Sequence, residues 1–550
     1  MPASSTVMKC APLLLLGAIA LGQDVPATPP APPPAPPQAP SPGNPPVALA
    51  PEKNACPSRS DPVAVGSVQW NGWGRDLFNT RYQPEPAIRA MDVPKLALKW
   101  AFGFQGGNEF SQPTLVDGRL FVTSSVGRVY ALDAKSGCTY WTYDAPAGSR
   151  TAISIGELGQ SKRAAIPRKL KRTLAHLDVI KAPSAAFFGD DTGAVYALDA
   201  QKGTLLWKTQ VDTHPTARIV GTPTLYNDRL YVAVGSNEDN KASNPNYSCC
   251  TFRGSVAALD IAGGRVVWKS FTVLEEPQPT HRSSAGVQEF GPAGAAIASS
   301  PTVDPKRGVL YVGTGRSATG VEQSLTDSIA AFGLSDGKLR WVKQLTVLGQ
   351  AGSSGFTSSP VLRTLASGNE VILAGQRSGV VYGLDPDHGG EILWQAKLGA
   401  DAKIDGGVAW GTAADYRSWF VALSGSLAEA GNSSGSLWAL DPKTGIARWH
   451  TPSPTPACSW SEGPCSHGQS QAVTVMPGGV FSGALDGHLR AYSTIDGKIL
   501  WDFDTAKAFQ TQNGVRASGG PLDHGGATIV NGGVYIVSGN TLLAFSVDGK

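Results

Sequence analysis

The 550-residue chain lacks several features that mark common cofactor and nucleic-acid sites. Its formal net charge of +3 is too small to favour nucleic acid as the main partner. The sequence has no C-x-x-C-H motif for covalent haem, no glycine-rich phosphate loop and no hydrolase nucleophile elbow. Its histidines show no metal-ligand spacing, so we expect no zinc site.

Long hydrophobic runs are also missing, apart from one near the N-terminus. The run APLLLLGAIAL at 11–21 follows Lys9 and is too short to span a bilayer, so residues 1–23 are predicted to be a secretory signal. Residues 24–55 are rich in Pro and Ala and cannot bury a core, which favours a semi-rigid linker. We therefore expect residues 56–550 to form the folded part of a periplasmic or extracellular protein, with no membrane span.

Export implies an oxidising compartment, in which disulfides persist. Without Cys10 in the leader, six of the seven cysteines remain: Cys56, Cys138, Cys249, Cys250, Cys458 and Cys465. Cys458 and Cys465 bracket a short loop and would close it readily. The adjacent pair Cys249–Cys250 is unusual, because neighbouring Cα atoms lie only about 3.8 Å apart and disulfides usually need roughly 4.4–6.8 Å. The alternative is that each of these two cysteines bonds elsewhere, since six cysteines allow several pairings.

The strongest pattern in the chain is an internal repeat of the form A-x-D-x-x-x-G-x-x-x-W, spaced by about 50–70 residues. Each copy is typical of a β-hairpin: a strand ends in Leu-Asp, a turn is closed by Gly, and a second strand ends in Trp. Another strand pair precedes most copies, as at 112–130, so each unit supplies about four strands. Four-stranded units that stack radially form a β-propeller, which protects its strand edges by closing on itself. The copies begin at residues 131, 197, 258, 331, 383, 439, 491 and 544.

The eighth copy, at 544–550, stops before its Trp, and the strand-like run LALKW at 96–100 ends in an unassigned Trp100. We predict an all-β fold: an eight-bladed propeller of four-stranded antiparallel blades, whose last blade is completed by the N-terminal strand. The repeated tryptophans are then interpreted as packing between blades, and the repeated acids as turn caps rather than catalysts. The acids are Asp133, Asp199, Asp260, Asp385 and Asp441.

Longer phrases narrow the interpretation further. The repeats together with WNGWGRDLFNTRYQ (70–83), NPNYSCCTFRGSVAALD (244–260), SSPTVDPKRGVLYVGTG (299–315), AGQRSGVVYGLDPD (374–387) and FSGALDGHLRAY (481–492) resemble the pyrroloquinoline quinone (PQQ) dependent alcohol dehydrogenases. Within that family they look most like the polyvinyl alcohol dehydrogenase group. The resemblance implies a propeller that binds PQQ and a divalent cation such as Ca²⁺ in its central funnel. It also implies oxidation of an alcohol by hydride transfer to the quinone.

The resemblance also implies roles for particular residues. Glu238 matches the family's metal-ligating glutamate, and Arg377 stands where the family has a lysine near the quinone oxygens. Ser236 and Thr222 fall where the family offers hydroxyls to a PQQ carboxylate. The Cys249–Cys250 pair would form a disulfide ring that lies over the quinone as a lid. The expected cofactor contacts are therefore Thr222, Ser236, Glu238, Cys249, Cys250, Arg316 and Arg377.

The sequence departs from the family pattern at three places. Arg316 follows GTG where the family has a metal-binding asparagine, and Ala298 stands where the family has a tryptophan floor. No acid occurs between Asp336 and Glu370, in the region where the family places its base. A hypothesis is that Arg316, paired with Glu238, supplies the positive charge in place of the cation.

The base is left to three candidates, and three interpretations of the whole chain stay open. The candidate bases lie in loops that can face the funnel: Asp405, Asp523 and Glu289.

The chain resembles a secreted PQQ dehydrogenase of secondary alcohols, including those on polymers. Such an enzyme has no haem of its own and passes electrons to a separate acceptor such as a cytochrome. The alternatives are a catalytically degenerate propeller that serves as a binding or assembly scaffold without PQQ, and a carbohydrate- or polymer-binding module. The basic run at 161–176 would either dock an acidic acceptor or form a solvated loop.

Overall fold

The computed structural model describes residues 49–57, 62–66, 69–107, 109–158, 183–319, 323–345, 355–398, 407–424, 435–456, 458 and 466–550. The predicted signal 1–23, most of the linker 24–55 and the basic run 161–176 lie outside the described residues. The described residues belong to one compact unit that extends over Pro46–Lys550. None of the helices in these residues is long and apolar enough to cross a membrane.

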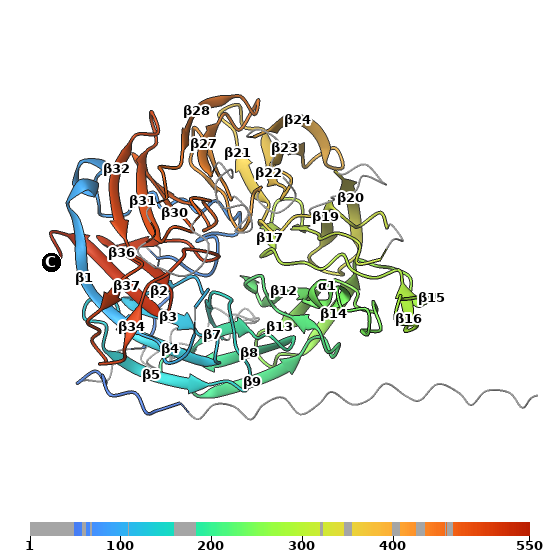
Figure 1. Cartoon of the computed structure of the whole chain (residues 1–550), viewed down its shortest axis with the longest axis horizontal. Coiled ribbons are helices and arrows are strands. Elements are labelled where there is room, and N and C mark those ends of the chain that lie inside the picture. The colour runs from blue at the N-terminus through green and yellow to red at the C-terminus, as the bar shows by residue number, and fades with distance from the viewer. Residues whose placement is uncertain are drawn as a thin grey trace, which may run out of the picture. The chain divides into compact units, whose positions relative to one another are not determined.

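Within the described residues, eight antiparallel sheets surround a common centre and form the blades of a propeller (Figure 1). Blade 1 contains β2 (Thr114–Val116), β3 (Arg119–Thr123), β4 (Arg128–Asp133) and β5 (Thr139–Asp144). Blade 2 contains β6 (Ser154–Glu157), β7 (Ser184–Gly189), β8 (Ala194–Asp199) and β9 (Leu205–Gln210). Blade 3 contains β11 (Thr224–Tyr226), β12 (Arg229–Ser236), β13 (Ser255–Asp260) and β14 (Val266–Phe271), and β10 (Ala217–Arg218) adds to β12. Blade 4 contains β17 (Thr302–Asp304), β18 (Val309–Gly313), β19 (Ser328–Gly333) and β20 (Leu339–Gln344).

The second half of the ring repeats this order. Blade 5 contains β21 (Val361–Thr364), β22 (Glu370–Gly375), β23 (Val380–Asp385) and β24 (Glu391–Lys397). Blade 6 contains β25 (Ala413–Ala414), β26 (Trp419–Leu423), β27 (Ser436–Leu440) and β28 (Ala447–Pro452). Blade 7 contains β29 (Thr474–Met476), β30 (Gly479–Gly483), β31 (His488–Ser493) and β32 (Ile499–Asp504). Blade 8 contains β35 (Thr528–Val530), β36 (Gly533–Ser538), β37 (Thr541–Val547) and β1 (Leu96–Gly103).

Four short elements lie outside the blades or at their ends. They are the 3₁₀ helix η1 (Ala90–Lys95), helix α1 (Glu238–Ala242), the hairpin of β15 (Gln278–Arg282) and β16 (Gln288–Gly291), and the hairpin of β33 (Ala508–Phe509) and β34 (Ala517–Ser518). Helix α1 and the β15–β16 hairpin lie on the loops of blade 3 and next to blade 4 (Figure 1).

The predicted closure of the ring is confirmed. Strand β1 pairs antiparallel with β37, with Leu98 opposite Phe545 and Trp100 opposite Ala544. The first strand of the fold therefore becomes the outer strand of the last blade, and the sheet edge that β37 would otherwise expose is paired. In Figure 1, β1 and β37 lie side by side although they come from opposite ends of the chain.

The repeat phrase joins neighbouring blades. In seven blades the Trp ring nitrogen donates a hydrogen bond of 2.9–3.3 Å to a backbone carbonyl of the next blade, as Trp100 does to Ala134 of blade 1. The Trp ring also packs on the Gly of that blade's turn: a Cβ at Gly264 would lie 2.5 Å from the ring of Trp207. Gly264 has a φ of +71°, so this position needs glycine for both its backbone and its size. The interpretation of the tryptophans as packing between blades is confirmed.

The repeated aspartates cap the turns, as predicted. The carboxylate of Asp199 accepts hydrogen bonds of 2.9 Å from the backbone nitrogens of Gln201 and Lys202, and Asp133 accepts in the same way. These carboxylates hold the turn on which the tryptophan of the preceding blade packs.

Residues 70–86 occupy the centre of the ring. Their backbone or side chains form hydrogen bonds with the innermost strand of seven blades, beginning with the backbone pair Trp70–Leu115 in blade 1 and ending with Gln83 Nε2 to the Ile529 carbonyl in blade 8. Arg81, which is 1% exposed, donates to the carbonyls of Val473 and Trp73 at 2.6 Å. Burial lowers the pKa of Arg81 to about 9. The phrase WNGWGRDLFNTRYQ is therefore an axial segment that ties the blades together.

A disulfide between Cys56 and Cys138 attaches the chain ahead of this axial segment to blade 1. The backbone of Thr139 exchanges hydrogen bonds with Asn54 and Cys56 beside it, at 2.7 and 3.0 Å. Cys458 is also disulfide-bonded, but its predicted partner Cys465 lies outside the described residues.

We expect Trp100→Ala to lower the free energy of unfolding by about 3–5 kcal/mol, because it empties the contact that joins the last blade to the first. Thermal or denaturant unfolding measures the loss. The control Ile495→Ala removes a side chain that is 85% exposed and should change stability by less than about 0.5 kcal/mol. Equal stability of the two variants would show that Trp100 does not hold the ring closed.

Candidate active site

The candidate site lies on the propeller axis, where loops from seven blades and the axial segment meet around a narrow cavity. Its aromatic lining comes from Trp73, Phe110, Trp410 and His524, and its other lining side chains include Arg150, Ala298, Ser300, Thr357 and Ser359. The cavity holds only about 20 Å³, roughly the space of a single water molecule. A larger ligand would therefore have to lie against the lining rings or displace them.

The aromatic rings form a column. The Trp410 ring stacks on His524 with a centroid distance of 3.7 Å and an interplanar angle of 25°. The Phe110 ring lies 4.6 Å from the His524 ring at an interplanar angle of 50°, and the Arg150 guanidinium lies 5.5 Å from the Phe110 centroid. Ala298, where the family resemblance places a tryptophan floor, borders this column. The flat surface at the axis is thus made by residues of other blades.

Asp523, one of the three candidate bases, holds this column. Its carboxylate accepts hydrogen bonds from the Trp410 ring nitrogen at 2.6 Å and from the Ser470 hydroxyl, and it lies 3.0 Å from Nδ1 of His524. Burial alone would raise the pKa of Asp523, but His524 and Ser470 outweigh it and hold the pKa below its ordinary value. A carboxylate that accepts so many hydrogen bonds is a weak proton acceptor and a good anchor for its neighbours.

The sequence interpretation passed over His524 as a functional residue. Only the fold reveals it, because its ring lines the axial cavity and its Nδ1 lies 3.0 Å from the Asp523 carboxylate. The dipeptide DH at 523–524 was the only signal in the sequence.

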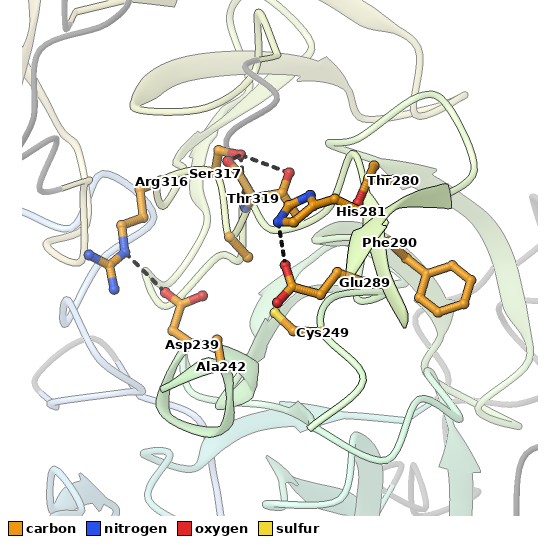
Figure 2. Close-up of a pocket in the computed structure, with 11 residues that line it drawn as sticks. Asp239, Ala242, Cys249, Thr280, His281, Glu289, Phe290, Arg316, Ser317 and Thr319 are labelled. Atoms are coloured by element: carbon orange, nitrogen blue, oxygen red, sulfur yellow. Dashed lines mark hydrogen bonds and ion pairs between the residues drawn. The ribbon is translucent and has the colours of Figure 1, made fainter. Parts of the chain in front are cut away.

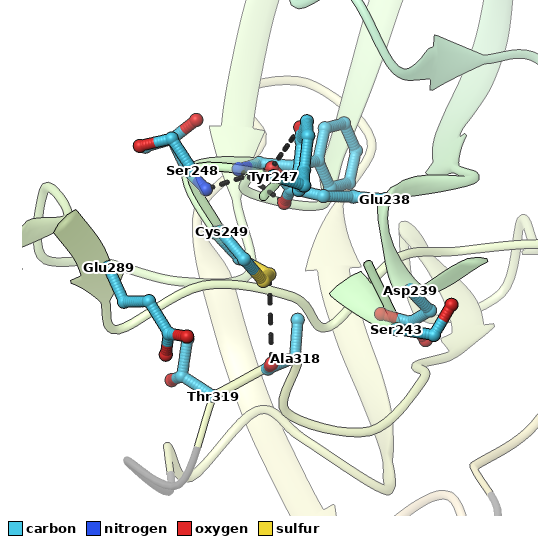
Figure 3. Close-up of a disulfide and its surroundings, with 12 residues drawn as sticks. Glu238, Asp239, Ser243, Tyr247, Ser248, Cys249, Glu289, Ala318 and Thr319 are labelled. Atoms are coloured by element: carbon cyan, nitrogen blue, oxygen red, sulfur yellow. Dashed lines mark hydrogen bonds between the residues drawn. A yellow bond between two sulfur atoms is a disulfide. The ribbon is translucent and has the colours of Figure 1, made fainter. Parts of the chain in front are cut away.

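Glu238 lies at the start of α1 and points into the protein (Figure 3). It is 1% exposed, and its two oxygens accept hydrogen bonds from the Tyr247 hydroxyl, the Thr251 nitrogen and the Phe252 nitrogen, at 2.9–3.0 Å. Burial and the nearby carboxylate both raise the pKa of Tyr247, which therefore remains a hydrogen-bond donor. Glu238 thus holds the segment that carries Cys249 and Cys250.

This geometry does not fit Glu238 as a calcium ligand. Calcium takes six to eight oxygens, and three protein donors already occupy most of the roughly four lone-pair sites of the Glu238 carboxylate. Among the described residues, no group of three or more His, Cys, Asp and Glu side chains could hold a metal ion. Arg316, placed near the site by the sequence, pairs with Asp239 at 3.4 Å. The expected Arg316–Glu238 pair is replaced because Glu238 turns inward and Asp239 turns outward.

The hydroxyls of Thr222 and Ser236 each accept a hydrogen bond from a nearby backbone nitrogen. Thr222 is 2% exposed; its hydroxyl accepts from the Ala152 nitrogen at 2.9 Å, and its own backbone nitrogen donates to Ser300 at 2.8 Å. Ser236 ends β12, and its hydroxyl accepts from the Glu238 nitrogen at 2.9 Å. Thr222 therefore links blades 2, 3 and 4, and Ser236 begins the turn into α1.

Arg377 follows β22 and sits beside the loops that reach the axis. Its backbone nitrogen donates to the Gly355 carbonyl at 3.2 Å, and its carbonyl accepts from Gly407 at 2.9 Å. Gly355 leads to Thr357 and Gly407 leads to Trp410, both of which line the axial cavity. Asp405 lies outside the described residues.

The disulfide between Cys249 and Cys250 forms part of the wall of a second, larger pocket of about 720 Å³ (Figure 2). Cys249 faces this pocket, while Cys250 is fully buried. Glu289, the third candidate base, lies on β16 in the same pocket and is 3.0 Å from His281. Glu289 and Asp523 therefore belong to different compartments.

Comparison with known proteins gives the family of the chain. Residues 70–393 match the model described as the glucose/ethanol/alcohol dehydrogenase β-propeller domain, and residues 326–550 match the model described as outer membrane protein assembly factor BamB. The chain is 40% identical over 542 residues to a polyvinylalcohol dehydrogenase of a Pseudomonas species, which covers 92% of this chain and 82% of that protein.

A second relative and a solved structure agree. The polyvinylalcohol dehydrogenase of Sphingopyxis sp. (strain 113P3) is 39% identical over 538 residues, which covers 90% of this chain and 79% of the relative. The quinohemoprotein alcohol dehydrogenase ADHIIG of Pseudomonas putida HK5 has a similar fold, with a TM-score of 0.64 and 19% identity over 88% of this chain and 80% of that one. This chain therefore belongs to the glucose/ethanol/alcohol dehydrogenase β-propeller family, whose members use PQQ.

Proposed function

We propose that this protein is an exported PQQ-dependent dehydrogenase that oxidises secondary alcohols and passes the electrons to a separate acceptor. The observation that carries the proposal is the aromatic column on the axis, with the Asp523–His524 pair built into it. Family membership supports the reaction class, and the names of the two relatives support a secondary alcohol as the substrate.

The residues at the axis fit PQQ in their chemistry. PQQ is flat and carries three carboxylates, so it needs aromatic surfaces and cationic or hydroxyl donors. Trp410, Phe110 and His524 offer the aromatic surfaces. Arg150, which also pairs with Asp191 at 3.3 Å, lies at the cavity, and Arg377 lies beside its loops; their guanidinium groups are the cations nearest to a bound carboxylate. When bound, PQQ supplies the hydride acceptor; the protein supplies the flat floor and the positive charge.

We assign the proton transfer to His524. An alcohol must lose its hydroxyl proton as the hydride leaves, and a histidine oriented by a carboxylate is suited to accept it at Nε2. Asp523, whose carboxylate lies 3.0 Å from Nδ1, keeps the ring in place. Asp523 itself, with its low pKa and its hydrogen bonds, acts through His524. The family resemblance places the carboxylate base before Gly355, where this sequence has no acid. We propose that His524 of blade 8 accepts the proton instead.

We further propose that no calcium ion is bound through Glu238. We also propose that the electron acceptor is a soluble protein such as a cytochrome. The Glu238 carboxylate accepts hydrogen bonds from the disulfide segment, so we assign the positive charge at the site to arginines.

The leader at 11–21 and the disulfide Cys56–Cys138 support export to the periplasm or the outside of the cell.

The first test is reconstitution. Purified protein mixed with PQQ should acquire quinone absorbance and reduce a dye when a secondary alcohol is added. His524→Gln should keep the bound quinone but lower kcat by on the order of 10²–10⁴-fold. The matched control His450→Gln changes an exposed histidine on β28 and should leave kcat unaltered.

Two results would count against the proposal. If the unaltered protein binds no quinone, the scaffold interpretation replaces the dehydrogenase. If His524→Gln keeps more than half of kcat, the proton acceptor is a different residue.

The second test concerns the cation. Glu238→Gln places an amide opposite backbone donors, so we expect it to lower the free energy of unfolding by about 1–3 kcal/mol with or without calcium. Calorimetric titration with Ca²⁺ should give the same result for the variant and the unaltered protein. Stoichiometric calcium binding that disappears in Glu238→Gln would restore the metal role.

A further inference from the structure

The axial segment bonds to the innermost strands of the blades in order, but it passes over blade 3. Asn71 exchanges two side-chain hydrogen bonds of 2.8 Å with the Ile155 backbone of blade 2. The next contact of this kind comes from Leu77, whose carbonyl accepts from the Val303 nitrogen of blade 4 at 2.8 Å. Within the described residues, no hydrogen bond joins residues 70–86 to the innermost strand of blade 3.

A cavity of about 210 Å³ fills this gap, and we call it the blade 3 cavity. Its walls come from the axial segment with the preceding Gln69, from Ser154 of blade 2 and from Thr222–Leu225 of blade 3. The side chains of Gln69, Asn71 and Arg75 are only half-buried, so solvent reaches the cavity. The volume equals that of roughly seven water molecules, which limits a ligand to a small molecule.

Strand β11 of blade 3 presents to this cavity the backbone groups that other blades use to bind the axial segment. Tyr226 pairs with Arg229 across a two-residue turn, and Leu225 is the next residue inward. Because alternate residues of an antiparallel strand direct their N–H and C=O groups to opposite sides, those of Leu225 face away from β12. The equivalent Leu115 of blade 1 exchanges two hydrogen bonds of 2.9 Å with Trp70. A ligand that contains an amide group can form the same two bonds with Leu225.

Three residues that line the cavity each contain a buried polar atom without a hydrogen-bond partner in the described part of the chain. They are the acceptor Gln69 Oε1 and the donors Trp73 Nε1 and Arg75 Nε. Native proteins rarely retain such atoms unless a ligand or a water molecule satisfies them. Two donors and one acceptor around one cavity are matched by a ligand that both accepts and donates hydrogen bonds.

The charges around the cavity favour an acidic group on the ligand. Arg75 and Asp76 are its two ionisable lining residues. The Asp76 carboxylate accepts hydrogen bonds of 3.0 Å from the Phe78 and Thr80 nitrogens and a further one from the Thr80 hydroxyl. Arg75 forms no ion pair with a described residue, and its φ of +70° is one that residues with a Cβ rarely adopt. The Arg75 guanidinium is therefore available to a carboxylate.

We propose that the blade 3 cavity binds a dipeptide in an extended conformation. Its amide group pairs with the nitrogen and carbonyl of Leu225, and its carboxylate accepts from Arg75 Nε and Trp73 Nε1. Its amino group donates to Gln69 Oε1. The dipeptide thus takes in blade 3 the place that the axial segment takes in the other blades, and it satisfies each of the three unpartnered atoms.

The blade 3 cavity borders the candidate active site but does not depend on the quinone. Trp73 lines both the blade 3 cavity and the axial cavity. The backbone nitrogen of Thr222, in the blade 3 cavity, donates at 2.8 Å to Ser300, which lines the axial cavity. A bound dipeptide would therefore contact a residue of the candidate active site from a separate compartment. Its binding can be measured on the quinone-free protein.

The test is calorimetric titration of the full, quinone-free protein with glycylglycine, for which a ligand of this size predicts a Kd on the order of 1 mM. Arg75→Gln removes the cation and should weaken binding by on the order of tenfold. Gln69→Leu should also weaken binding but leave the thermal unfolding temperature unchanged, because Oε1 has no partner in the protein. The matched control Arg265→Gln changes an exposed arginine between β13 and β14 and should bind glycylglycine normally.

Three analogues of the probe test its groups one at a time. Glycylglycinamide lacks the carboxylate, N-acetylglycine lacks the amino group, and 5-aminopentanoate has two CH₂ groups in place of the amide. Each should bind more weakly than glycylglycine, and Arg75→Gln should not weaken glycylglycinamide further. The site is wrong if glycylglycine shows no saturable binding up to about 50 mM, or if Arg265→Gln weakens it as much as Arg75→Gln does. Equal affinity for 5-aminopentanoate would overturn the pairing with Leu225.

Discussion

The contact between the tryptophan of one blade and the glycine turn of the next holds this molecule together. Seven of the tryptophans pack on a turn glycine of the next blade, and in seven blades the tryptophan donates a hydrogen bond across the junction. The contact acts between neighbours, so it stabilises a row of blades but does not by itself close the row. Closure depends on β1, which brings Trp100 to the first blade from the last.

A ring closed in this way leaves a central hole, and the axial segment fills it. Residues 70–86 satisfy inner-strand backbone groups in seven blades that would otherwise face the axis. Arg81 is held there by carbonyls and aromatic faces instead of by a carboxylate. Because the segment lies under the loops that carry Phe110, Trp410 and His524, it supports the floor of the candidate site.

The site combines an ordinary family scaffold with altered side chains. Glu238 retains its place in the chain, but its carboxylate is directed to the Cys249–Cys250 segment and away from the axis. Three observations then belong together: the inward Glu238, the outward Arg316–Asp239 pair and the pocket between them and the β15–β16 hairpin. Of the residues that the family resemblance assigned to the cofactor, Cys249 and Arg316 line this second pocket.

The sequence by itself determined the repeat, the number of blades, the turn-capping aspartates and the strand that closes the ring. These features rest on local rules, because a hairpin needs its acid, glycine and tryptophan at fixed spacing. The sequence left the disulfide between Cys56 and Cys138 as one of several possible cysteine pairings. Tertiary structure alone decided which side chains share a site. Asp523 and His524 meet Trp410 and Phe110 from distant parts of the chain, and the direction in which Glu238 points depends on Tyr247 and Phe252, which no spacing rule connects to it. Loop conformation is set by such long-range hydrogen bonds, so the sequence could suggest that the loops of Asp523 and Glu238 face the funnel but could not assign the partners of these residues.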